Sequence, residues 1–132
     1  MTKFLIQYGI VLVIFFAIDM IWLGLIAKNF YAKKLGFLMA PKVNWIAAFV
    51  FYLIFILGLL VFVIQPALAA ESLTQGIFMA ALFGLVTYAT YDLTNLATLK
   101  DWPLIITIVD LAWGISLSVI VSTLSILILT RL

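Results

Sequence analysis

The stretch Trp45–Gln65, WIAAFVFYLIFILGLLVFVIQ, decides the fold because it contains no charged side chain. It matches the roughly 20 apolar residues that an α-helix needs to cross the hydrocarbon core of a bilayer. A run of this length and composition predicts a helix that crosses a membrane.

Three further apolar runs of similar length flank this one. The four runs predict an all-α protein, an integral membrane bundle of four transmembrane helices. We expect residues 1–132 to form a single transmembrane domain with helices at about 4–27, 45–65, 73–98 and 103–130. Pro41, Pro66 and Pro103 lie at the predicted helix ends, where a missing N–H group does least harm.

The composition of the whole chain agrees with this prediction. Hydrophobic residues make up 68% of the sequence and charged residues only 9%, whereas about 25% of a soluble domain is charged. This excludes a soluble secreted fold, a disordered chain and a nucleic-acid partner, and leaves the lipid bilayer as the expected partner. The sequence has no cysteine and no histidine, so we expect no metal site and no cofactor.

The basic residues predict the orientation of the bundle. Most of them fall in the loop Lys28–Asn44 or at Lys100, on one side of the membrane, while Lys3 and Arg131 fall on the other. The positive-inside rule therefore places this loop in the cytoplasm and both termini on the opposite side. The lysines and aromatic residues of the loop fit either a segment lying at the lipid surface or a simple topology signal with aromatic anchors.

Three aspartates interrupt the predicted helices and are the most informative residues. Asp19, Asp92 and Asp110 each cost about 2.5–3.5 kcal/mol at the centre of a membrane helix, so each should point into the bundle. Each lies about six to eight residues from the same end of the bundle, on the order of 10 Å below the membrane surface at ~1.5 Å per residue. Three carboxyl groups at one depth predict a single site.

Aromatic and polar residues accompany the acids at helical spacing. They complete a candidate ligand-binding or proton-binding set, which consists of Asp19, Trp22, Tyr88, Tyr91, Asp92, Asn95, Asp110 and Trp113. No basic residue lies within a span, so the acids cannot all be ionised without a bound cation or proton. The alternative is a hydrogen-bonded network that only holds the helices together. Gly114, Ser118 and Ser122 form a stripe of small residues that lets another helix approach closely.

Several of these residues also belong to a known pattern. The run Tyr91–Thr98 (YDLTNLAT), Trp102–Pro103 and the run Asp110–Gly114 (DLAWG) resemble the signature of a bacterial family, domain of unknown function 2177 (DUF2177). The early run Asp19–Gly24 (DMIWLG) is similar to the same pattern. The resemblance covers essentially the whole chain and implies a small four-helix protein of the bacterial inner (cytoplasmic) membrane. The family has no established activity, so the resemblance assigns no catalytic residue.

Three functions remain open at this point. The first is a protein that binds or transports a small molecule or lipid with proton coupling, and a transport path through so narrow a bundle would need a homodimer. The second is a lipid-modifying membrane enzyme or its accessory subunit, using an aspartate as acid or base. No nucleophile, nucleotide site or cofactor motif supports this second function. The third is a structural or accessory membrane protein in which the polar cluster only holds the helices together by hydrogen bonds.

Overall fold

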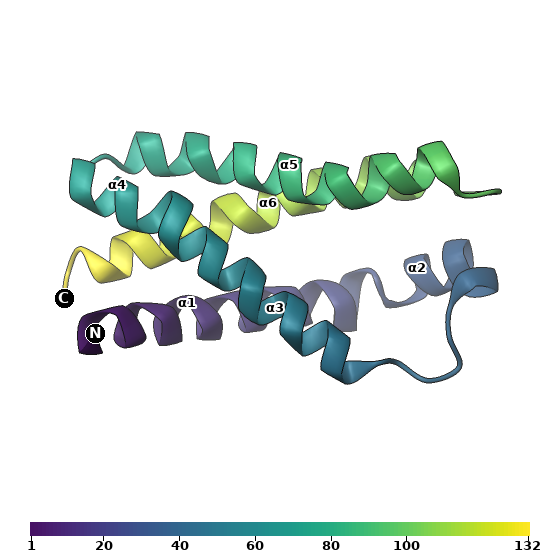
Figure 1. Cartoon of the computed structure of the whole chain (residues 1–132), viewed down its shortest axis with the longest axis horizontal. Coiled ribbons are helices and arrows are strands. Elements are labelled where there is room, and N and C mark those ends of the chain that lie inside the picture. The colour runs from purple at the N-terminus through teal and green to yellow at the C-terminus, as the bar shows by residue number, and fades with distance from the viewer.

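The computed structural model describes all 132 residues, and helices make up nearly all of the chain. Four of its helical segments are long and apolar enough to cross a membrane, namely Thr2–Ile26, Trp45–Ala70, Leu73–Thr98 and Leu104–Leu129. The predicted all-α fold with four membrane spans is therefore confirmed. Both termini lie at one end of the bundle, and the short helix α2 lies at the other (Figure 1).

Two of the spans contain a turn of π-helix. The helical elements in chain order are α1 (Thr2–Ile21), a π-helical turn (Trp22–Ile26), α2 (Lys28–Leu35), a 3₁₀ turn (Gly36–Leu38), α3 (Trp45–Leu59), a second π-helical turn (Leu60–Ile64), α4 (Gln65–Ala70), α5 (Leu73–Thr98) and α6 (Leu104–Leu129). The predicted loop between the first two spans thus holds a helix and a 3₁₀ turn.

The second span extends past its predicted end at Gln65 and continues through Pro66 to Ala70. In the π-helical turn that precedes it, the Gln65 N–H donates to the Leu60 carbonyl, five residues back instead of four. Pro66 then stands in the first turn of α4, where its missing N–H is tolerated. The proline therefore marks an irregularity inside a span, and the helix ends at Glu71, which has a positive φ of 50°.

Helices α5 and α6 pack against each other along most of their length. Small buried residues line this contact on both sides, including Gly84 on α5 and Gly114 on α6. A Cβ atom at Gly84 would overlap the carbonyl oxygen of Gly114 and the hydroxyl of Ser118, and a Cβ at Gly114 would overlap the ring of Tyr88. The close helix approach predicted for this stripe is confirmed at Gly114 and Ser118, and α5 is the helix that approaches. Ser122, further along α6, is fully buried.

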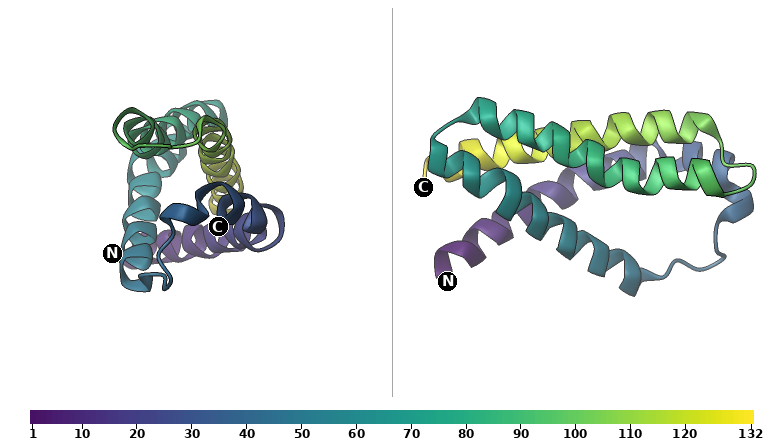
Figure 2. Two further views of the ribbon diagram at one scale, coloured as in Figure 1. Left: turned by 90° about the vertical axis from the view of Figure 1, so that its right-hand side faces the viewer. Right: turned by 45° about the horizontal axis from the view of Figure 1, so that its top comes forward.

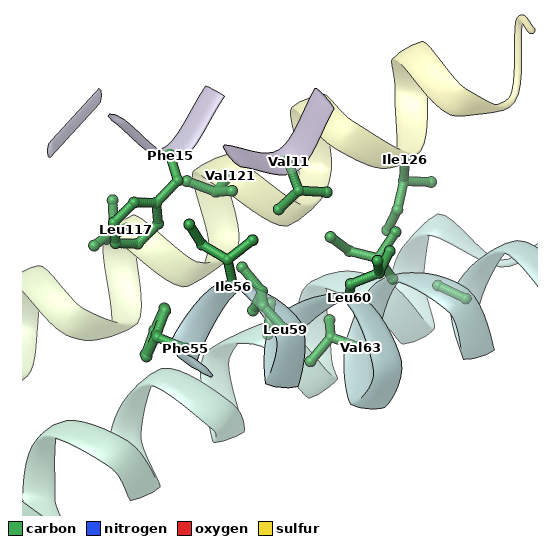
Figure 3. Packing of buried hydrophobic residues seen from close by; sticks show 13 residues of the cluster. Val11, Phe15, Phe55, Ile56, Leu59, Leu60, Val63, Leu117, Val121 and Ile126 are labelled. Atoms are coloured by element: carbon green, nitrogen blue, oxygen red, sulfur yellow. The ribbon is translucent and has the colours of Figure 1, made fainter. Parts of the chain in front are cut away.

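The apolar core fills the middle of the bundle and the half nearer the termini. Figure 3 shows side chains of α1, of α3 with its π-helical turn, and of α6 meeting there, among them Val11, Phe15, Ile56, Leu60, Leu117 and Val121. At the other end, the beginning of α3 leans away from α5 (Figures 1 and 2). The aspartates Asp19 and Asp110 lie in this wider half.

Candidate functional site

An open cleft of about 410 Å³ lies in the wider half of the bundle, and residues from α1, α2, α3, α5 and α6 line it. This volume falls in the range of small-molecule binding sites. Six members of the predicted set line the cleft: Asp19, Trp22, Tyr88, Tyr91, Asp110 and Trp113. The structure thus brings residues from three separate spans to one place.

Asp92 is the seventh member of the predicted set and does not line the cleft. Its side chain is fully buried, and its carboxyl group lies within hydrogen-bonding reach of the Asp110 carboxyl. Neither oxygen of Asp92 has a donor for a partner. Because a carboxylate can only accept hydrogen bonds, two carboxyl groups in this arrangement bond to each other only by sharing a proton. Two neighbouring carboxyl groups of this kind can hold one proton between them.

Asp19 approaches the cleft from α1 and is 4% exposed. It is close enough to Asp110 for the two charges to interact, and it faces the hydroxyl of Tyr52 on α3. No group of three His, Cys, Asp or Glu side chains is arranged to hold a metal ion. Asp110 therefore lies near both of the other aspartates, Asp92 and Asp19.

Aromatic side chains form the walls of the cleft between the acids. The rings of Trp22 and Trp113 are stacked, with centroids 4.4 Å apart and planes 9° apart. Each tryptophan follows an aspartate by three residues, Trp22 after Asp19 and Trp113 after Asp110, which places it one turn further along the same helix face. The indole N–H of Trp22 is buried without a partner, so it remains available as a donor beside the cleft.

Tyr31 on α2 closes the cleft from the end of the bundle. Its hydroxyl donates to Oδ1 of Asp110 at 2.6 Å, and its ring meets the edge of Trp22. Burial raises the pKa of the Tyr31 hydroxyl, and the hydrogen bond to Asp110 raises this pKa further. The hydroxyl therefore keeps its proton and remains a donor. Through this hydrogen bond Tyr31 anchors α2, whose lysines are exposed.

The backbone around Asp92 is held by the turn between α5 and α6. The indole N–H of Trp102 donates to Oγ1 of Thr107 at 3.0 Å, and this hydroxyl donates to the Asp92 carbonyl at 3.3 Å. The edge of the Trp102 ring also meets Tyr91, with centroids 5.8 Å apart. These contacts fix α5 relative to α6 at the level of the carboxyl pair.

Seven residues that line the cleft are not in the predicted set, and two of them, Tyr31 and Tyr52, are polar. Two members of the predicted set, Asp92 and Asn95, do not line the cleft. Tyr31 falls in the predicted loop, and Tyr52 lies in the run that contains no charge. A signal for Tyr52 exists, because its hydroxyl is the only polar side-chain group between Trp45 and Ile64. Asn95 lies one turn beyond Asp92, half-buried, and is not among the residues that line the cleft.

Replacing Tyr31 with phenylalanine is expected to free α2 from the cleft. A hydrogen bond to a charged group contributes about 1.5–3 kcal/mol, so its loss should make local opening of α2 more frequent by roughly tenfold or more. Trypsin cleavage after the exposed residues Lys33 and Lys34 of the protein in lipid nanodiscs measures this opening.

The matched control for this variant is Tyr8→Phe. Tyr8 also donates a hydrogen bond across the bundle, to the Leu53 carbonyl at 2.8 Å, but it lies away from α2. Tyr8→Phe should leave the cleavage rate unchanged. Equal cleavage rates in Tyr31→Phe and wild type would show that the hydroxyl does not hold α2.

The comparison with protein families agrees with the resemblance found in the sequence. A family model described as "Predicted membrane protein (DUF2177)" matches residues 4–127, nearly the whole chain. No curated protein and no solved structure matches the chain.

Proposed function

We propose that this chain, which belongs to the DUF2177 family of predicted membrane proteins, binds a positively charged small molecule in the cleft and releases a proton in exchange. The observation that carries this proposal is the gathering of Asp19, Asp92 and Asp110 in a membrane-spanning bundle with no basic residue lining the cleft. Buried charge within a membrane requires a partner. In the empty site this partner is a proton, and in the occupied site it is the cationic ligand.

The aromatic walls favour an organic cation over a small inorganic ion. Trp22, Tyr88, Tyr91 and Trp113 line the cleft beside the acids, and aromatic faces attract positive charge at short range. Tyr31 and Tyr52 add hydroxyl groups to the same walls. The proposed site therefore combines carboxyl groups for charge with rings for the apolar part of the ligand.

Exchange of a cation for a proton is the elementary step of a proton-coupled carrier, and we propose this role. The lysines of α2 and Lys100 lie at the end of the bundle that holds the cleft, whereas both termini lie at the opposite end (Figure 1). By the positive-inside rule, we propose that the cleft lies near the cytoplasmic face. The homodimer that transport would require stays a prediction.

The proposal is tested with tetraphenylphosphonium, an organic cation that cannot itself bind or release a proton. Adding it to purified protein in a weakly buffered detergent solution should quench tryptophan fluorescence, because Trp22 and Trp113 lie in the cleft. We expect about one proton released for each cation bound, since the two share one carboxyl pair. A pH-sensitive dye measures the release.

Two controls make the result specific. Tetraphenylborate has the same shape and the opposite charge, and it should neither bind nor release a proton. The variant Asp101→Asn removes an exposed acid outside the cleft, at a position with φ of 62° that asparagine tolerates, and it should bind as wild type does. Binding of tetraphenylborate as tight as that of the cation, or cation binding without proton release, would overturn the proposal.

A further inference from the structure

A second cavity adjoins the acidic cleft and extends it between α3 and α5. It has a volume of about 370 Å³ and is lined by Phe51, Thr87, Tyr88, Tyr91 and Asp110. Four of these five residues also line the cleft, and Thr87 is the addition. The two spaces therefore adjoin each other: Asp110 lines both, and Phe51 and Tyr91 form the aromatic end of the second cavity.

The aromatic end opens on the outer surface of the bundle. Phe51 and Tyr91 stand at its rim and are 49% and 56% exposed. Further along α3, Phe55 contacts Phe83 and Tyr88 with ring centroids 5.2 and 6.2 Å apart, so the gap between α3 and α5 closes there. The opening is thus confined to the wider half of the bundle, where α3 leans away (Figure 2).

This opening lies at the depth of lipid chains. Phe51 stands six residues after the first residue of α3, Trp45, and Tyr91 seven before the last residue of α5, Thr98. At ~1.5 Å per residue, both lie roughly 10 Å inside the membrane-spanning segments. The outer surface of the bundle faces acyl chains at this level. By contrast, α2 covers the end of the bundle, where Tyr31, Leu35 and Met39 line the cleft.

We infer that the ligand is an amphiphile dissolved in the bilayer, which carries a single amine or ammonium group on a hydrocarbon chain. The ligand enters sideways between α3 and α5. Its cationic group reaches Asp110 and Asp19, while its chain lies against Phe51 and Tyr91 and continues into the surrounding lipid. This inference rests on the proposed function, because the acids must bind a cation. It adds the chemical class of the ligand and its route.

The test compares two cations with the same headgroup, tetramethylammonium and dodecyltrimethylammonium. Each competes with tetraphenylphosphonium for the protein in lipid nanodiscs, and empty nanodiscs give the correction for partitioning. The variant Thr87→Phe fills the second cavity without removing an acid. We expect it to weaken binding of dodecyltrimethylammonium by about tenfold, as overpacking of a filled site does, and to leave tetramethylammonium unchanged.

The matched control is Thr90→Phe, on the same helix. Like Thr87, Thr90 donates to a carbonyl one turn earlier, but it is exposed and lines neither space. This variant should bind both cations as wild type does. Equal effects of Thr87→Phe on both cations, or no effect on either, would overturn sideways entry and leave the proposed function intact. If wild type binds neither cation, the proposed function itself fails.

Discussion

Replacing Gly84 with leucine is expected to destabilise the folded protein strongly. Its Cβ would overlap the Gly114 carbonyl oxygen and the Ser118 hydroxyl, and a backbone atom cannot move aside as the end of a side chain can. Helices α5 and α6 would have to separate, although the packing of small residues is what stabilises such contacts in lipid. Overpacking costs about 3 kcal/mol at the upper end of its usual range.

We therefore expect Tm to fall by roughly 10 °C and the yield from the membrane to fall with it. Size-exclusion chromatography of samples heated in detergent measures both. The matched control is Gly9→Leu in α1, where no atom lies within 4 Å of the position of a Cβ. This control should keep the wild-type Tm. A Gly84→Leu protein as stable as Gly9→Leu would show that the contact between α5 and α6 is looser than described.

The four spans could be predicted because they depend on residue type alone. A run without charge is visible in the sequence, and the length needed to cross a bilayer is fixed. The end of the second span could not be predicted in this way. A proline at position 66 predicts the end of a helix. The π-helical turn before it changes the hydrogen-bonding pattern, and the span continues past the proline. The sequence of that turn gives no signal for π-helical hydrogen bonding, because Leu60–Ile64 are all ordinary apolar residues.

A common depth for the three aspartates could be predicted because a helix rises by a constant amount per residue. Distance from a helix end therefore gives depth, and this argument placed Asp19, Asp92 and Asp110 at one level. Depth says nothing about how each helix is rotated or how the chain folds back after a span. Tyr31 was missed because it reaches the cleft only through the return of α2. Asn95 is half-buried and does not line the cleft, although Tyr88 and Tyr91 on the same helix do.

The variant Asp110→Asn is expected to lose cation binding by about 30-fold or more, the effect of removing one partner from a buried charge pair. Asp110 lines the cleft, accepts the hydrogen bond from Tyr31 and forms the carboxyl pair with Asp92. Asparagine keeps the size and can still accept from Tyr31, so the loss should come from the charge. Proton release on adding tetraphenylphosphonium should disappear as well, because an amide and a carboxyl group share no proton.

The variant Asp92→Asn separates the two roles proposed for the carboxyl pair, which are cation binding and proton release. Asp92 is buried and does not line the cleft, so this variant should still bind the cation through Asp110 and Asp19 while proton release is lost. Asp101→Asn should retain both, and an unchanged Tm would show that each variant is folded. Wild-type binding and proton release in Asp110→Asn would remove the carboxyl pair from the mechanism. Because Asp92 and Asp110 have nearly the same depth but only Asp110 lines the cleft, different outcomes for the two variants would show that access to the ligand sets the role of each.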